Sequence, residues 1–341
     1  MYAFYFYTLL LMVQTSFAWY DNKQQQAYEP CSEVLQKNLP QGKSCTNISL
    51  PFYHEQRGEL EGATREKNGG SLGRILPISL AIVNYTLHDS TKESIESLRR
   101  NRVSGHIIID EDGNVIETVS PEKRAWHAGV SSFREHPNQT STTNVNSASY
   151  GILLVNQGPV LCIEKKFNPV FIEGTEEILG KSDMCWQPYT DEQITTLAIL
   201  YKGLQKEYPT LQRLVGHGEV APRRKIGPGA AFPWEKLAKE HGITMWPQIS
   251  PEQQKQLISK TKKEGIEWAQ QALNALGYDI PVSGIFDNIT RSALQTFQMH
   301  YRPTLIAGDL DDETLHILND LLKQIKAQEA SPKETLPPCF E

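Results

Sequence analysis

The chain has 341 residues, of which 39% are hydrophobic and 22% are charged. This composition is typical of a globular protein with one large core and room for a small second domain. The net charge of −6 gives no support for binding to nucleic acids, whose partners carry a basic surface, and we expect no nucleic-acid partner.

The N-terminal stretch 1–18, MYAFYFYTLLLMVQTSFA, predicts a secretory signal peptide, because small residues at Ser16 and Ala18 follow an apolar run. A membrane anchor needs about 20 apolar residues, and this run is shorter and is interrupted at Gln14. No cysteine follows the expected cleavage site to carry a lipid. We therefore expect a periplasmic or secreted protein without a transmembrane anchor. Residues 19–75, rich in Gln, Lys and Gly with little periodicity, predict an N-terminal extension.

Residues 76–250 alternate between strand and helix patterns. The strongest are a buried strand at 77–86, a helix with one charged face at 90–101, two strands around a turn at 106–120, a strand at 150–156, and a helix with an acidic start at 190–208. Strands and helices mixed in this order predict an α/β domain, with a central mixed β-sheet flanked by helices.

Residues 264–325 predict a small C-terminal domain of three helices, and residues 326–341 a polar tail. Pairs of apolar residues recur at helical spacing, and two glycines mark the turns between helices. The pairs are Leu273 and Leu276, Ala293 and Phe297, and Leu315 and Leu318, and the glycines are Gly277 and Gly284.

Five cysteines suit an oxidising compartment. We expect the disulfides Cys31–Cys45 and Cys162–Cys185, with Cys339 left over, while other connectivities stay open on the sequence alone. Metal binding is the rival interpretation of these cysteines. The lack of CxxC spacing argues against it.

Four segments carry a family resemblance: IVNYT at 82–86, WHAG at 126–129, YGILLVN at 150–156 and HGEVAPRRKIGPGAAFPW at 217–234. Together they resemble the zinc-dependent N-acetylmuramoyl-L-alanine amidases of bacterial cell-wall turnover. In that family the first segment ends in HYT, whose His binds zinc, and the third reads IGIELEN, with a catalytic Glu. The fourth, HxDxxPxRKxDPG, supplies a second His and an Asp as ligands. The matching residues here are Asn84, Leu153, His217 and Gly227.

The resemblance implies that His217 alone remains of three zinc ligands. A catalytic zinc needs three protein ligands and an open position for a water, whose pKa then falls to about 7. Asn84 offers a neutral amide, Gly227 has no side chain, and Leu153 lacks the carboxylate of a base. We therefore expect no bound zinc and no other cofactor. Lys225 matches the family's lysine and stays as a cation for binding or for an oxyanion.

Other residues match positions that family members keep near the cleft. We expect His106, Trp126, His127 and Asn156 to contact sugar or peptide, with plain packing as the alternative. His217 has an alternative role too, as a histidine hydrogen-bonded within the domain.

A repaired metal site is the second possibility. His88 lies four residues after Asn84, and it could join His217 and Glu219 around a metal. Strand-end geometry places His88 on the following loop, which argues against this repair.

The segment 264–325 is similar to a three-helix peptidoglycan-binding module with the pattern QxxLxxLGY, GxFdxxTxxAVxxFQ and DGxxdxxT. The two resemblances imply a secreted protein that binds peptidoglycan or muropeptides through an inert cleft and this module. Animal peptidoglycan-recognition proteins, which resemble the same amidase fold and include members without zinc, offer a parallel. The alternative is an active amidase that cleaves the bond between N-acetylmuramic acid and L-alanine with a rearranged metal site. No protein partner is indicated.

Overall fold

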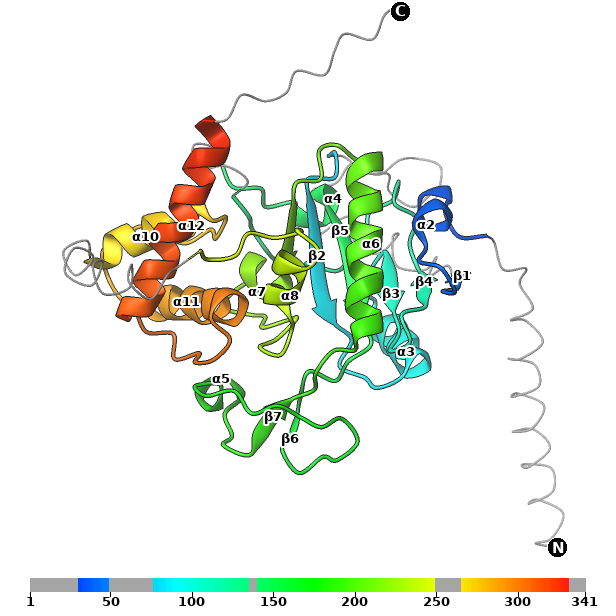
Figure 1. The fold of residues 1–341 in the computed structure, drawn as a ribbon, viewed down its shortest axis with the longest axis horizontal. Helices are drawn as coiled ribbons and strands as arrows, with labels where there is room; N and C mark the ends of the chain where they lie inside the picture. The colour runs from blue at the N-terminus through cyan, green and yellow to red at the C-terminus, as the bar shows by residue number, and fades with distance from the viewer. Residues whose placement is uncertain (1–29, 49–75, 135–139, 249–264, 331–341) are drawn as a thin grey trace, which may run out of the picture.

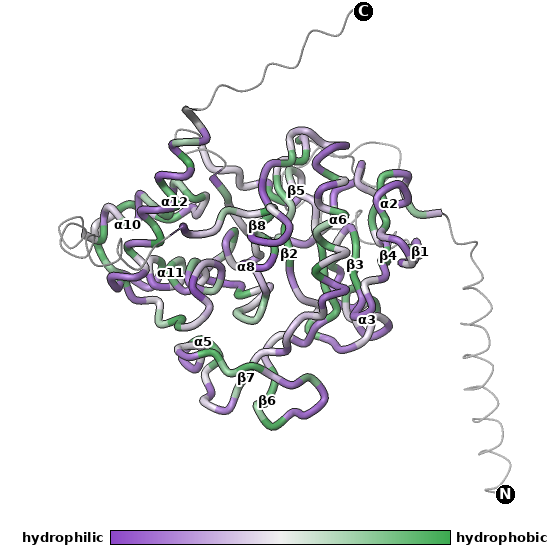
Figure 2. The backbone as a smooth tube through the Cα atoms, in the orientation of Figure 1, coloured by the Kyte–Doolittle hydropathy of each residue, from purple (hydrophilic) through white to green (hydrophobic). Residues whose placement is uncertain are grey.

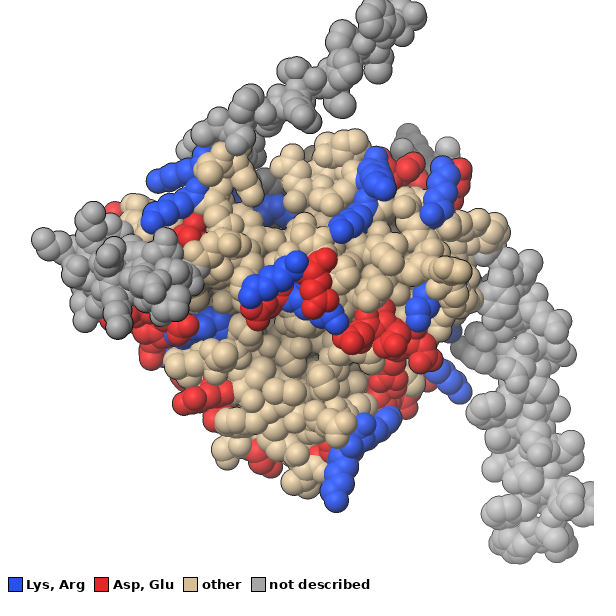
Figure 3. Space-filling model, in the orientation of Figure 1, with Lys and Arg blue, Asp and Glu red and all other residues tan. Residues whose placement is uncertain are grey.

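The computed structural model describes residues 30–48, 76–134, 140–248 and 265–330 (Figure 1). The expected signal peptide, Cys339 and the C-terminal tail beyond residue 330 lie outside these ranges. Among the described helices, none is long and apolar enough to cross a membrane. Acidic and basic side chains intermix on the face drawn in Figure 3.

A six-stranded mixed sheet forms the centre of the molecule, in the order β1-β4-β3-β5-β2-β8. Strands β3 and β4 pair antiparallel, and the other neighbours pair parallel. The predicted α/β fold with a mixed sheet is therefore confirmed. The strands are β1 (Cys45–Asn47), β2 (Leu80–Tyr85), β3 (Ile107–Ile109), β4 (Val115–Glu117), β5 (Ser149–Leu154) and β8 (Arg213–Gly216).

Helix α6 (Asp191–Glu207) covers one face of the sheet (Figure 1). It begins at a capping box, in which Thr190 and Gln193 each bond the other's backbone N–H. The main core lies under this helix, where Ala81 and Val83 of β2 point. Because side chains alternate along a strand, Leu80, Ile82 and Asn84 point to the opposite face.

The opposite face is covered by α3 (Thr91–Asn101), by the loop that follows β4, and by the short helices α4 (Val145–Ala148) and α7 (His217–Val220). Helix α3 is the one predicted at 90–101, and Ser90 caps its first turn. This less densely covered face carries the candidate site.

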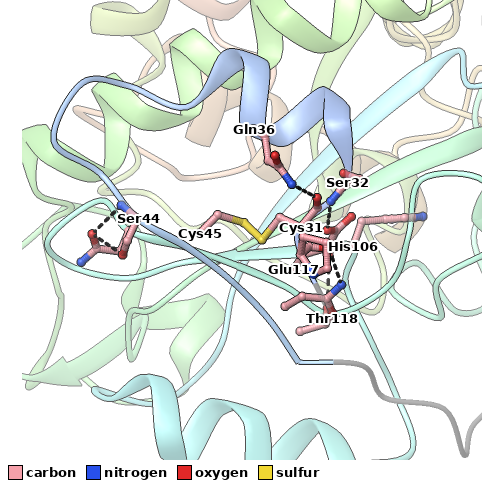
Figure 4. Close-up of a disulfide and its surroundings, with 11 residues drawn as sticks. Cys31, Ser32, Gln36, Ser44, Cys45, His106, Glu117 and Thr118 are labelled. Carbon is pink, nitrogen blue, oxygen red and sulfur yellow. Dashed lines mark hydrogen bonds between the residues drawn. A yellow bond between two sulfur atoms is a disulfide. The ribbon is translucent and has the colours of Figure 1, made fainter. Parts of the chain in front are cut away.

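The N-terminal extension contributes to the sheet, which its sequence did not predict. Helix α2 (Glu33–Asn38) packs on α6, and β1 pairs with β4 at the sheet edge. A helix of six residues and a strand of three are too short to produce a periodic pattern. The predicted Cys31–Cys45 disulfide is present and ties the two together (Figure 4).

An insertion between β5 and α6 forms a small separate sheet of two strands, β6 (Pro159–Leu161) and β7 (Met184–Trp186). The short helix α5 (Glu176–Leu179) lies between these strands in the sequence. The predicted Cys162–Cys185 disulfide closes the insertion. Figure 2 shows β6 and β7 as mainly hydrophobic and the bend that follows β6 as hydrophilic. Trp186 is buried and packs against Gly229, so the insertion supports the loop that follows α7.

The C-terminal domain has the three predicted helices, α10 (Gly265–Ala275), α11 (Asn288–Tyr301) and α12 (Asp312–Ala330). All six apolar residues named from their spacing are buried. Gly277 and Gly284 have φ values of 110° and 69°, which an L-residue rarely adopts. Helix α11 packs on α7 and on α8 (Trp234–Lys239), so this domain is docked on the first.

Candidate functional site

A cleft of about 590 Å³ opens on the sheet face opposite α6. The carboxyl ends of β2 and β5 form its floor, and α3 and the segments 126–130 and 217–225 form its walls. Its lining includes Asn84, Tyr85, Leu87, Leu98, Val103, Ser104, Trp126, His127, Val130, Asn146, Leu153, His217, Arg224 and Lys225.

Asn84 and His217 meet on the cleft floor. Asn84 Nδ2 lies 2.9 Å from His217 Nδ1, and His217 Nε2 lies 3.0 Å from the Ala128 carbonyl oxygen. Since a carbonyl only accepts, Nε2 carries the proton and Nδ1 accepts from the Asn84 amide. Burial, together with a smaller effect of the nearby cations Lys225 and Arg224, lowers the pKa of His217 to about 3, although the hydrogen bond with Ala128 opposes this shift. The ring is therefore neutral at neutral pH and uses both nitrogens within the protein.

Gly227 lies directly against the other side of the Asn84 amide. A Cβ atom added at Gly227 would overlap Asn84 Oδ1. An aspartate at position 227 is therefore incompatible with Asn84 in its present conformation. The amide of Asn84 occupies the space between His217 and the backbone of Gly227. Asn84 and Gly227, the residues that stand at two ligand positions of the resembled family, therefore fit one another.

Leu153 belongs to an apolar cluster instead of a polar site. It pairs with Asn84 across β5 and β2, so both residues point to the cleft face. Only 6% of its surface is exposed, and it packs with residues of α3 and of the neighbouring strands. A Cβ atom at Gly105 would lie 2.9 Å from Leu153 Cγ, so this side of the cluster is closely packed. The cluster comprises Ile95, Ile108, Ile116, Leu153 and Val155, with Leu98 packed against it.

The residues present do not fit zinc. Tetrahedral zinc takes imidazole, thiolate or carboxylate donors, and His217 offers one nitrogen that already accepts from an amide. Asn84 directs its NH2 group at that nitrogen, and position 227 has no side chain. In the ranges that the structure describes, no group of three or more His, Cys, Asp and Glu side chains is placed to hold a metal.

The repaired site of His88, His217 and Glu219 is not formed. Glu219 Oε1 accepts from the Gly216 N–H at 2.7 Å and lies 3.0 Å from His300 Nδ1 of the C-terminal domain. Neither His88 nor Glu219 lines the cleft. The hypothesis of a metal held by these residues is wrong for this conformation, because Glu219 serves the contact between the domains.

Two cations stand on the wall formed by 217–225. The Arg224 guanidinium donates to Ala128 O at 2.6 Å and to Val130 O at 2.8 Å, so it holds the opposite wall in place. Lys225 lines the cleft beside it, as the sequence predicts. Partial burial and the neighbouring Arg224 lower the pKa of Lys225.

Two of the four predicted contact residues, Trp126 and His127, line the cleft. The Trp126 ring lies 4.8 Å from the Arg124 guanidinium, and His127 Nε2 lies 2.8 Å from Ser149 Oγ. These contacts hold the two rings in place, so Trp126 and His127 form a fixed part of the cleft wall. Asn146, which the sequence did not single out, orients this segment by accepting from the N–H groups of His127 and Ala128.

The other two, His106 and Asn156, do not line the cleft. His106 is fully buried, accepts from the Gly151 N–H at 2.8 Å and stacks on Tyr150. Asn156 is buried and donates to the carbonyls of Gln187 and Pro188 at the base of the insertion. Both positions favour the packing alternative over contact with a ligand.

Sequence reasoning missed Arg224, although it adjoins Lys225 in the same motif. Because Arg224 is next to Lys225, its place on the cleft wall could have been inferred from the motif. The apolar wall residue Leu98 gave no signal, because α3 has the pattern of a surface helix with one charged face, and Val103 follows that helix outside any motif.

Comparisons with known proteins identify the families that the two domains match. Residues 75–230 match the N-acetylmuramoyl-L-alanine amidase family, and residues 262–318 match a peptidoglycan binding domain family. The chain is 28% identical over 257 residues to N-acetylmuramoyl-L-alanine amidase AmiD of Escherichia coli, a match that covers 72% of this chain and 83% of AmiD. It is 33% identical over 158 residues to the 1,6-anhydro-N-acetylmuramyl-L-alanine amidase AmpD of E. coli, which covers 46% of this chain and 68% of AmpD.

Solved structures share the fold. The E. coli AmiD complex with anhydro-N-acetylmuramic acid-L-Ala-D-gamma-Glu-L-Lys superposes with a TM-score of 0.57 at 26% identity, over 77% of this chain and 93% of that one. AmpDh3 of Pseudomonas aeruginosa in complex with anhydromuramic pentapeptide gives a TM-score of 0.58 at 25% identity, over 77% of this chain and 98% of that one.

Proposed function

The chain belongs to the N-acetylmuramoyl-L-alanine amidase family, and on that premise we propose that it is a peptidoglycan-binding member that holds muropeptides without hydrolysing them. Hydrolysis of an amide at neutral pH needs an activated water and a group that moves its proton. Among the residues that the structure describes, the cleft lining offers no set of side chains placed to hold a metal that would activate a water, and no carboxylate to move a proton.

One observation carries this proposal: the Asn84 amide bonds His217 Nδ1 and leaves no room for a side chain at Gly227. These residues match the three zinc-ligand positions of the family. A single replacement could leave a weakened metal site. Here two ligands are replaced and the third has its nitrogen engaged, so a working zinc centre would need several coordinated changes.

Retained binding is supported by the cleft and by the second domain. A volume of about 590 Å³, lined by aromatic and aliphatic side chains with a few polar groups, is typical of a small-ligand site. AmiD and AmpDh3, which share the fold, are solved with muropeptide ligands. The matched peptidoglycan binding domain at 262–318 keeps its apolar core.

We place the protein in the periplasm or outside the cell. Two disulfides between described cysteines support an oxidising compartment. The expected signal peptide at residues 1–18 belongs to the same proposal.

Intact peptidoglycan sacculi test the proposed function in one experiment. Purified protein is incubated with sacculi, and both the sedimented protein and the released peptide are measured, with and without a chelator. We expect co-sedimentation without peptide release in either condition. E. coli AmiD serves as the positive control for release, since its name gives it this activity. Release that a chelator abolishes would establish a working metal site and overturn the proposal.

A further inference from the structure

The charged side chains that line the cleft are both cations. Arg224 and Lys225 stand on one wall, and no Asp or Glu occurs among the described residues of the lining. Arg224 is engaged, because its guanidinium donates to the carbonyls of Ala128 and Val130. The Lys225 ammonium makes no hydrogen bond or ion pair with any described residue. Lys225 is therefore the cation that a ligand can reach.

The surroundings of Lys225 increase the effect of its charge. The cleft is otherwise formed largely by apolar and aromatic side chains, including Leu98, Trp126 and Leu153. An ammonium at the rim of an apolar pocket is less screened than one in open water, so an anionic group that enters gains more from it. Leu153 stands where the family has a glutamate, so this family carboxylate is not present to compete for the lysine.

We propose that Lys225 binds a free carboxylate of a peptidoglycan stem peptide, so that the cleft selects anionic muropeptides over amidated ones. This inference rests on the proposed function and names its ligand class. The stem in the AmiD complex, L-Ala-D-gamma-Glu-L-Lys, shows which groups are suitable. A glutamate linked through its γ-carboxyl leaves the α-carboxylate free, and the terminal residue carries another.

Calorimetric titration of the intact chain with defined ligands tests the inference. The probe is anhydro-N-acetylmuramic acid-L-Ala-D-γ-Glu-L-Lys with both carboxylates free, compared with the forms amidated at the glutamate, at the terminus, or at both. We expect the doubly amidated form to bind about tenfold more weakly, as is typical of losing one charged hydrogen bond. The two singly amidated forms identify the carboxylate that Lys225 contacts. The preference should shrink as salt rises, because the Lys225 side chain, although partly shielded by the cleft wall, still reaches solvent and salt screens its charge.

Variants separate the lysine from the rest of the cleft. Lys225→Gln should bind the free and the amidated ligands equally, and Lys225→Arg should keep most of the preference. Lys202→Gln is the matched control, since Lys202 is an exposed lysine on α6 outside the cleft lining. All three variants should unfold at the wild-type temperature, because neither lysine has a partner that folding requires.

The outcomes distinguish the two proposals. Equal binding of free and amidated ligands by the wild type, or an unchanged preference in Lys225→Gln, overturns the carboxylate anchor and leaves muropeptide binding intact. Failure of every ligand to bind at millimolar concentration overturns both.

Discussion

At the residue scale, the side chain missing from position 227 determines what position 84 can hold. The Asn84 amide uses the space that any Cβ at Gly227 would enter. Its bond to His217 fixes the amide's orientation, so it has little freedom to move aside.

We therefore expect Gly227→Ala to destabilise the protein by about 1–3 kcal/mol, as overpacking of a well-packed interior usually does. In an Asn84→Ala background the same change should cost at least about 0.5 kcal/mol less, because the clashing atom is gone. Urea denaturation of the four proteins in this double-mutant cycle measures the difference. Strictly additive effects would show that the two positions do not interact.

Zinc chemistry should return only with coordinated changes. We expect Asn84→His with Gly227→Asp to bind about one zinc per chain and to gain thermal stability from added zinc, since a metal that binds the folded state stabilises it. Adding Leu153→Glu should give weak amidase activity. Activity should be weak because the apolar cluster around Leu153 would favour the protonated form of a carboxyl group there.

Each single variant is the control for this reconstruction. Asn84→His alone and Gly227→Asp alone should bind no stoichiometric zinc by elemental analysis, because neither completes three ligands. Tightly bound zinc in the unmodified protein would show that the residues already present can hold the metal, which contradicts this prediction.

The resemblance to the amidase motifs singled out Asn84, Leu153, His217 and Gly227, and the structure brings Asn84 against both His217 and Gly227. Asn84 and Leu153 fall on paired strands, which bring them to one face. The bond between Asn84 and His217 was not predictable, since it depends on how helix α7, which begins at His217 and lies 133 residues further along the chain, packs on β2. His106 was expected to contact a ligand or to pack inside the domain, and its burial outside the cleft lining favours packing. A sequence motif does not show which way a ring points.

At the element scale, strand β4, which lies next to the edge strand β1, carries a buried carboxyl group. Glu117 is 2% exposed, and its Oε2 accepts from the Ser32 N–H at 2.5 Å, beside the Cys31–Cys45 disulfide (Figure 4). Burial raises the pKa of Glu117, and the bond from Ser32 partly opposes that shift. The folded protein therefore retains this proton to a higher pH than the unfolded chain does.

The direction of the pH effect follows from this shift. The stabilisation from the protonated group is fully present below the unfolded-state pKa, about 4.3, and is lost as pH rises through the raised folded-state pKa. Glu117→Gln cannot ionise and keeps an oxygen for the Ser32 N–H. Relative to wild type, its free energy of unfolding should increase by more than about 0.5 kcal/mol from pH 4 to pH 8.

Urea titrations at the two pH values measure this change. Glu96→Gln, at an exposed position of α3, is the control and should show no such trend. A Glu117→Gln variant that follows the wild-type pH dependence would show that Glu117 ionises freely in the folded state.

At the scale of the whole molecule, the two predicted domains are joined by buried contacts. The His300 ring stacks on Trp234 with a centroid distance of 3.9 Å, and its Nδ1 lies 3.0 Å from Glu219. The Arg213 guanidinium donates to the Leu276 carbonyl at 2.6 Å. Trp246 packs against both cores. Sequence periodicity predicted each domain separately, but it could not predict this docking, because buried polar residues such as His300 read as surface positions of a helix.

We expect the intact chain to unfold in one cooperative transition, with circular dichroism and tryptophan fluorescence coinciding. Glu219→Ala should cost about 2–4 kcal/mol, since it leaves the Gly216 N–H and His300 Nδ1 without their acceptor. It should also separate the transitions of the two domains. Glu235→Ala, which removes an exposed pair with Lys239, is the control and should change stability by less than about 0.5 kcal/mol.

The fit between Asn84 and Gly227 also bears on how this protein can change over evolutionary time. In the inert protein that we propose, the family's divalent metal and its carboxylates at positions 153 and 227 are absent together, so two positive and two negative charges are missing and the net charge of the cleft is unaltered. Leu153→Glu alone would break that balance, and Gly227→Asp alone would also meet the overlap with Asn84, so both changes pass through a less stable intermediate. Under the proposed function, selection can therefore refine ligand choice more easily than it can recover hydrolysis.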